Sequence, residues 1–260
     1  MALNYPPIAI SVAWIATIAT DQYKEQTMTP AQQHHQLKTI LQLAYDPVGV
    51  SGAGDSEPVT AGLAPAPSAC SFWRRAEMAR FTADAASHTN CKVGAHVMGF
   101  TLVGEDMQEL GALVQTMTGV AYIAPEEVPA LPRLPEHKAW HYTPLSTASA
   151  TPELVLLWID GRQVMLVQEA MGSAHWNSGK GLRTTGRPAC GALALAYHHA
   201  DAVLSFGCAG MRTFTEIPDG LMLLVVPGEA VEGLCRGLEQ TAKSNAAVQC
   251  VYDKQKNAFA

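Results

Sequence analysis

Residues 186–227, "GRPACGALALAYHHADAVLSFGCAGMRTFTEIPDGLMLLVVP", contain the pattern that decides the fold. The pattern predicts a helix over residues 190–199, a strand over residues 202–208 and a buried strand over residues 220–227. An amphipathic helix is expected next, over residues 228–243. Because strands alternate with helices, we expect an α/β or α+β fold in which helices cover a mixed sheet.

The same alternation extends toward the N-terminus. A nearly continuous apolar run at residues 152–160 is typical of a strand buried on both faces. Thr29 is predicted to cap the first helix, with Pro30 at its first position. Further helices are expected over residues 31–44, 70–86, 105–119 and 161–172, and further strands over residues 47–50 and 139–145.

The composition is that of a compact globular protein. Of the 260 residues, 48% are hydrophobic and 15% charged, which is enough to bury a core. The formal net charge of −6 argues against a nucleic-acid partner, because phosphate contacts need a basic surface. The apolar segment at residues 8–19 follows no basic residue and is shorter than the ~20 residues of a membrane helix. We therefore expect a strand or packing segment there in preference to a targeting element, no membrane partner and a cytoplasmic protein.

Two of the six cysteines are expected to serve packing alone. Cys235 shares the apolar stripe of its predicted helix with Val231, Leu234 and Leu238, where a thiol behaves as a small hydrophobic group. Cys250 alternates with hydrophobic residues near the C-terminus and receives the same interpretation.

The other four cysteines lie at boundaries between predicted elements, where thiols can converge. Without a secretion signal there is no reason to pair them as disulfides. No CxxC pair is present, which disfavours a structural zinc site. The residues alone leave open an iron–sulfur cluster, buried thiols or a single catalytic thiol. The four are Cys70, Cys91, Cys190 and Cys208.

Several segments, taken in order, resemble the prokaryotic domain-of-unknown-function family numbered one-sixty-nine. Order and approximate spacing match from about residue 36 to residue 243, and the segments with Cys91 and Cys208 are the most specific. The matching segments are "LAYDPVGV", "CSFWRRA", "HTNCKVGAHVMGF", "YTPL", "ELVLLWIDGRQVMLVQEAM", "RPACG" and "SFGCAGMRTFTEIPDGLMLLVVPGE".

The resemblance implies a single α/β domain over residues 36–260, with residues 1–35 as an N-terminal extension. It also implies cysteines at the four positions above and favours a four-thiolate cluster, of the 4Fe-4S type. It implies no reaction. In the family, the second cysteine is typically followed by proline and glycines, whereas Lys92 follows Cys91 here.

Such a cluster could perform two kinds of chemistry. If all four thiolates bind, electron transfer with a partner protein is expected. If one thiolate does not bind, an open iron could act as a Lewis acid and help remove a hydroxyl, thiol or halide from a substrate. The candidate anion-binding residues are Arg183 and Arg187 in the glycine-rich loop, together with Arg212.

Three more residues are candidate catalytic groups: His88, His175 and Lys180. Both histidines are expected on loops, and the alternative for all three is an ordinary solvated position. His198 and His199 end a helix and are interpreted as structural.

Three functional hypotheses follow from these residues. The first is an enzyme that acts on a small anionic substrate through an iron–sulfur cluster. The second is a sensor or delivery module that holds a metal or cluster without catalysis. The third is a metal-free enzyme with Cys190 or Cys208 as its nucleophile. The apolar N-terminal segment is also compatible with a homo-oligomer.

Overall fold

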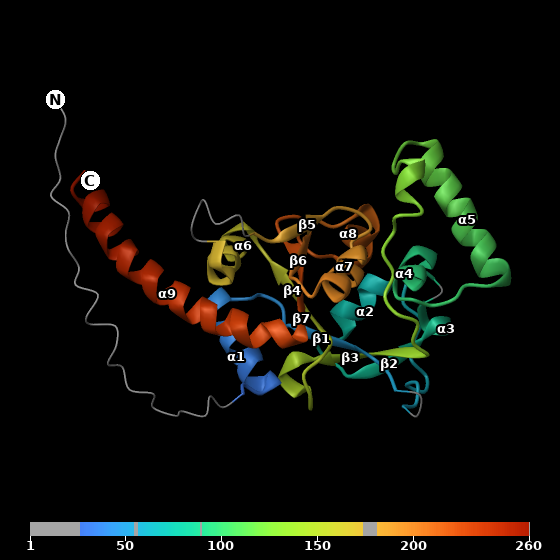
Figure 1. Ribbon diagram of the computed structural model, residues 1–260, viewed down its shortest axis with the longest axis horizontal. Coiled ribbons are helices and arrows are strands. Elements are labelled where there is room, and N and C mark those ends of the chain that lie inside the picture. Colours follow the sequence, from blue (N-terminus) through green and yellow to red (C-terminus); the bar gives the residue numbers. More distant parts are fainter. Residues whose placement is uncertain (1–26, 55–56, 89, 174–180, 260) are drawn as a thin grey trace.

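The computed structural model describes residues 27–54, 57–88, 90–173 and 181–259. Its centre is a seven-stranded sheet with the strand order β2-β3-β1-β4-β7-β6-β5 (Figure 1). All neighbouring strands are antiparallel except the parallel pair β5 and β6. The strands are β1 (Val48–Gly52), β2 (Phe81–Asp84), β3 (Ala139–Pro144), β4 (Leu154–Ile159), β5 (Arg183–Thr185), β6 (Val203–Ser205) and β7 (Met222–Pro227).

Helices cover both faces of this sheet. Along β4, the side chains of Leu154, Leu156 and Trp158 join one core, and the residues between them join a second core on the opposite face. Alternation with apolar residues on both sides is the pattern of a doubly covered strand. The predicted α/β domain with a mixed sheet between helices is therefore confirmed. The first core includes α2 (Ala69–Arg75), α4 (Lys92–Val97), α7 (Gly191–His199) and α8 (Ala209–Thr215), and the second includes α1 (Pro30–Leu41), α6 (Gly161–Gln168) and α9 (Gly228–Asn257).

The remaining elements are short or peripheral. The helix α5 (Gly104–Gly119) lies at one end of the molecule, and the distal half of α9 projects from the opposite end (Figure 1). The others are α3 (Ala85–His88), η2 (Pro125–Glu127), η3 (Leu145–Thr147) and η4 (Glu169–Ser173). Among the described residues, no helix is both long and apolar enough to cross a membrane.

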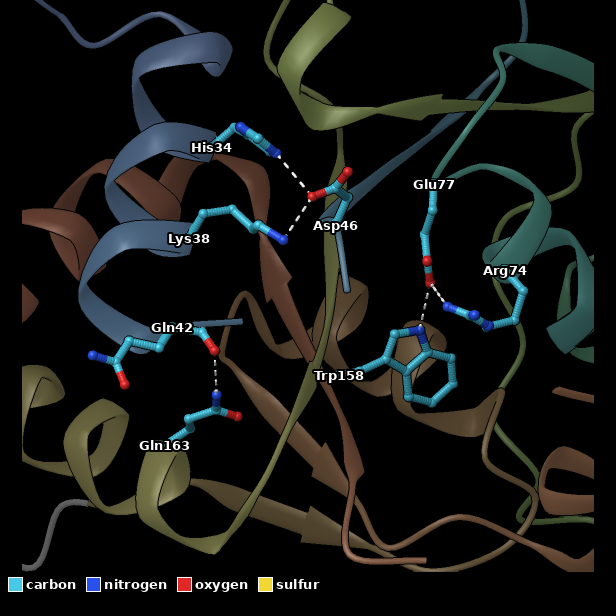
Figure 2. Close-up of polar contacts among 8 residues, drawn as sticks. All are labelled: His34, Lys38, Gln42, Asp46, Arg74, Glu77, Trp158 and Gln163. Atoms are coloured by element: carbon cyan, nitrogen blue, oxygen red, sulfur yellow. Dashed lines mark hydrogen bonds and ion pairs between the residues drawn. The ribbon is translucent and has the colours of Figure 1, made fainter. Parts of the chain in front are cut away.

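The first helix begins as the sequence predicts. Thr29 caps α1 through a reciprocal capping box with Gln32, and Pro30 is the first helical residue. The helix is joined to the start of β1 by Asp46, whose carboxylate lies 2.9 Å from Lys38 and 3.4 Å from His34 (Figure 2). Burial alone would raise the pKa of Asp46, but these two neighbours lower it below its usual value. The helix runs without a break across residue 35, the predicted end of the N-terminal extension.

The prediction of one helix over residues 70–86 is wrong. The helix α2 ends at Arg75, the chain turns, and β2 pairs with β3 in antiparallel register. The alanines that suggested a continuous helix, such as Ala83, also fit a buried strand position, so strand pairing decided the structure. The end of α2 is fixed by Glu77, which accepts a hydrogen bond from the Trp158 indole at 3.2 Å and pairs with Arg74 (Figure 2).

The C-terminal helix is longer than predicted. Its first third packs on the sheet, with Cys235 fully buried as expected beside Leu234 and Leu238. Beyond that point the helix leaves the body of the molecule (Figure 1). Cys250 lies on this projecting part and is exposed, so its predicted packing role is wrong. An alternating apolar pattern cannot bury a residue when the helix has no neighbour to pack against.

Candidate functional site

The structure brings four cysteines from distant parts of the chain into one neighbourhood. Cys70 is the second residue of α2, whereas Cys91, Cys190 and Cys208 occupy the N-cap positions of α4, α7 and α8. Burial raises the pKa of the Cys70 thiol, and the nearby Cys190, Cys208 and Cys91 thiols raise it further. The pKa of Cys190 is raised by burial and by the Cys91 and Cys208 thiols. The four thiols therefore lie close enough to interact electrostatically, and we call this neighbourhood the thiol site.

The four thiols differ in burial. Cys70 and Cys190 are only 6% and 4% exposed, whereas Cys91 and Cys208 are half-buried. The two half-buried thiols also accept backbone hydrogen bonds: Cys91 Sγ from the Gly94 amide and Cys208 Sγ from the Met211 amide, both at 3.4 Å. Cys70 and Cys190 thus form the buried side of the site, and Cys91 and Cys208 form its accessible side.

Small residues allow the cysteine-bearing helices to approach one another. A Cβ atom at Gly94 would lie 2.7 Å from the Ala69 Cβ atom and 3.1 Å from the Cys91 Sγ atom. Real Cβ contacts are not that short, so α4 can pack against the start of α2 only with glycine here. Gly207, directly before Cys208, has a φ of +92°, which also favours glycine.

The raised pKa values of Cys70 and Cys190 keep these two unliganded thiols protonated near neutral pH, so they are poor nucleophiles, whereas a metal group would bind them as thiolates. Within the described ranges, no three or more His, Cys, Asp or Glu residues are grouped closely enough to hold a metal ion. One tetrahedral zinc would need sulfur atoms about 3.8 Å apart. In a four-iron cluster each thiolate binds a different iron, so the sulfur atoms lie further apart.

One orphaned polar atom lies close to the cysteines in the sequence. Trp73 follows Cys70 by three residues on α2, which places both on the same side of that helix. Its buried indole N–H has no hydrogen-bond acceptor within the described part of the chain. An unsatisfied buried donor is costly, and a bound group that accepts its hydrogen bond would remove that cost. This observation is compatible with a sulfur-rich group on that side of α2.

A tyrosine–histidine pair lies beside the buried cysteines. Burial raises the pKa of Tyr142, and the Cys70 and Cys190 thiols raise it further, which places the phenol near both. The His88 ring nitrogens contact the Asp84 carbonyl at 2.7 Å and the Tyr142 hydroxyl at 2.9 Å. Because a carbonyl only accepts, His88 Nδ1 donates to it, and Nε2 accepts from the tyrosine.

His88 does not lie on the expected loop. It is the last residue of α3, is 1% exposed, and has its pKa lowered to about 4 by burial. The sequence suggested a loop because "SHTN" interrupts the apolar pattern. In this position, a neutral His88 orients Tyr142 and does not reach the solvent.

A cavity of about 630 Å³ opens on the accessible side of the thiol site. Two of the three predicted anion-binding arginines, Arg187 and Arg212, line it together with Cys208. The Arg187 guanidinium lies 4.2 Å from the centre of the Tyr122 ring. Arg212 donates to the Phe206 carbonyl at 3.1 Å and to the Pro218 carbonyl at 2.9 Å, which fixes its guanidinium at the wall.

Other predicted site residues lie elsewhere. Arg183 is exposed on β5 and does not line the cavity. His175 and Lys180 fall outside the described residues. Lys92, the departure from the family pattern, contacts Asp106 at 2.5 Å and Glu109 at 3.0 Å, so its charge connects the start of α4 to α5.

Three residues that line the cavity were not identified from the sequence. Nothing in the spacing of Tyr122 and Glu127 points to a site. Phe206 could have been identified, because it lies two residues before Cys208 in one of the segments that match the family most specifically.

The fold and site define an α/β protein with four clustered thiols beside an arginine-lined cavity. Residues 36–237 match the family described as "Uncharacterised ArCR", domain of unknown function 169. The chain belongs to this family, which confirms the resemblance found in the sequence. No curated protein and no solved structure matches the chain.

Proposed function

We propose that this protein is a cytoplasmic iron–sulfur enzyme that acts on a small anionic molecule. The convergence of Cys70, Cys91, Cys190 and Cys208 from four separate helix starts carries this proposal. Four thiolates at one buried site would repel each other and lose hydration, so a multi-iron cation is the partner that makes their burial favourable. A 4Fe-4S cluster would accept four thiolates, or three thiolates with one iron left open for Lewis-acid chemistry.

The position of the cavity favours catalysis over simple storage or sensing of a cluster. Cys208 is both a member of the thiol site and part of the cavity wall, so a molecule in the cavity would lie next to the site. Arg187 and Arg212 supply the positive charge for a carboxylate, which guanidinium groups bind in a bidentate manner. Tyr122 and Phe206 add flat apolar walls.

The reaction that best fits these groups is elimination from a hydroxy acid or a related thiol or halide. When bound, the cluster would supply Lewis-acid assistance to the leaving group. The carbon–heteroatom bond breaks and its electron pair leaves with the heteroatom. A neighbouring carbon loses a proton and a carbon–carbon double bond forms, so no oxidant or reductant is consumed. We assign the role of proton acceptor to Glu127, which lines the cavity and whose carboxylate also accepts a hydrogen bond from the Ala124 amide at 2.6 Å.

One observation favours a second candidate, a metal-free thiol enzyme. Cys208 is half-buried, lines the cavity and accepts an amide hydrogen bond at its sulfur atom. Those are properties of a nucleophilic cysteine. In that case the other three cysteines would be dispensable for activity, whereas a cluster requires several of them. An electron-transfer role with a partner protein remains the variant in which all four thiolates bind iron.

The deciding experiment is to purify the protein without oxygen and measure iron, sulfide and zinc together with the visible absorption spectrum. We expect a brown protein with about four irons and four sulfides per chain. Serine at a ligating position among Cys70, Cys91, Cys190 and Cys208 should reduce iron content and change the spectrum, while Cys235→Ser, a buried control outside the site, should retain both. If three of the four variants lose the cluster and one retains it, the remaining position marks the open iron.

A colourless, metal-free protein would contradict the cluster. The thiol-enzyme alternative would then predict that iodoacetamide modifies Cys208 faster than the exposed Cys250. Equal rates at the two thiols would contradict that alternative as well.

A further inference from the structure

The cavity beside Cys208 has room for more than the smallest hydroxy acids. Its volume is about 630 Å³, within the range of sites that enclose drug-sized ligands, so an acid of two or three carbons would leave most of it empty. Its wall carries two guanidinium groups, from Arg187 and Arg212, and one carboxylate, from Glu127. A substrate matched to this cavity therefore carries a negative charge and a second, larger group.

The two arginines of the cavity differ in the use of their N–H groups. Arg212 donates to the carbonyls of Phe206 and Pro218, so its guanidinium is already engaged with the wall. The Arg187 guanidinium lies over the Tyr122 ring and makes no hydrogen bond or ion pair with the described residues. A contact with a ring holds the guanidinium in place but leaves N–H donors unpaired. Arg187 is therefore the arginine that can offer two parallel N–H groups to a carboxylate.

Phe206 presents an aromatic ring to the same cavity from a fixed backbone. Its amide donates to the Thr185 carbonyl at 3.2 Å, and its carbonyl accepts from Arg212 at 3.1 Å. The next amide, that of Gly207, donates to Ser205 Oγ at 3.1 Å. Phe206 is nevertheless 56% exposed. A rigid and exposed ring can bury apolar surface against a ligand at a small cost in conformational entropy.

Building on the proposed function, we propose that the cavity binds an aryl-substituted hydroxy acid. The carboxylate binds to Arg187, and the aryl group packs against the Phe206 ring. Aromatic pairs in offset or edge-to-face contact gain free energy in addition to that of burying apolar surface. Cys208, two residues after Phe206, lines the same cavity, so a ligand held at these two points lies beside the thiol site.

The test is isothermal titration calorimetry of the full chain, purified without oxygen, with phenyllactate and with lactate, which lacks only the phenyl group. We expect one phenyllactate per chain, with a dissociation constant at least about tenfold lower than that of lactate. Phe206→Ala should abolish most of this preference. Phe214→Ala is the matched control and should retain it, because Phe214 is 43% exposed on α8 but does not line the cavity.

Arg187→Lys tests the other contact. It should weaken the binding of both acids by a similar factor, because an ammonium group cannot bind a carboxylate in a bidentate manner. Three results would overturn the proposal: no saturable binding of phenyllactate, equal affinity for the two acids, or equal loss of preference in Phe206→Ala and Phe214→Ala.

The iron and sulfide content of the same preparation reports on the cluster separately. A brown protein that does not discriminate between the two acids would contradict the aryl class and leave the proposed function standing. A colourless protein that binds phenyllactate through Phe206 would support the aryl class and contradict the cluster.

Discussion

The environment of His88 determines its protonation state and its role in the protein. A histidine in a sequence suggests acid–base chemistry near neutral pH, but burial against aromatic rings keeps this one neutral. Both ring nitrogens are used inside the protein, one by Asp84 and one by Tyr142. Its role is therefore to hold a phenol near Cys70 and Cys190, which is a positioning role.

The lowered pKa of His88 predicts acid sensitivity. Above its unfolded pKa of about 6.5, the residue is neutral in both states and has no effect on the pH dependence. As the pH falls from 6.5 toward the folded pKa of about 4, the unfolded chain binds the proton first, so stability is lost in that window. The loss attributable to His88 should reach about 3 kcal/mol near pH 4.

Urea unfolding at a series of pH values tests this. His88→Gln should show a flatter dependence between pH 6.5 and 4 than the unmodified protein, while His199→Gln, at an exposed position on α7, should retain the original dependence. The idea fails if His88→Gln and the unmodified protein lose stability in parallel over that window.

At the scale of elements, the thiol site depends on how closely two short helices approach. Gly94 lies at the contact between α4 and the start of α2, where a side chain has no room. Gly111 in α5 offers a contrast, since a Cβ atom there would meet nothing within 4 Å. The same substitution at these two positions should therefore have opposite effects.

Gly94→Ala should destabilise the protein by about 1–3 kcal/mol, because the added methyl group forces α4 away from Ala69. It should also reduce iron content, since Cys91 lies on the displaced helix. Gly111→Ala should be neutral or stabilising by up to about 1 kcal/mol, because alanine favours an exposed helix. Chemical denaturation and iron analysis of both variants are the measurements. If the Gly94→Ala protein had native stability and iron content, close packing of α4 against Ala69 would not be required.

At the scale of the molecule, the described chain has a compact body and a projecting helix. Buried residues of α9 end at Leu238, and Val248, Val251 and Tyr252 are exposed further along. Figure 1 shows this distal part leaving the body. A helix without tertiary contacts contributes little to the stability of the fold.

Removal of residues 248–260 should therefore shift Tm by no more than about 2 °C. Differential scanning calorimetry of the shortened and full chains is the direct comparison. A large decrease in Tm that depends on protein concentration would instead mean that this segment is buried between copies of the chain.

Sequence reasoning succeeded where a pattern is local and failed where distant segments meet. The apolar runs of β4 and β7 and the cap at Thr29 could be predicted, because periodicity and capping depend on near neighbours. The end of the helix at Arg75 could not be predicted, because the alanine-rich residues that follow are compatible with a helix. They form a strand only because they pair with β3. Likewise, the contact between Tyr142 and the cysteines has no signature in the chain, because it exists only through tertiary packing.

The order of strands in the sheet has a consequence for how the protein is made. β7 lies between β4 and β6, so a growing chain cannot complete the sheet until residue 227 has been synthesised. Cys70 and Cys91 are synthesised well before Cys190 and Cys208, the other two members of the thiol site. Pairing between such distant segments is slow. Any group that binds all four cysteines can therefore be acquired only after residue 208 has been synthesised.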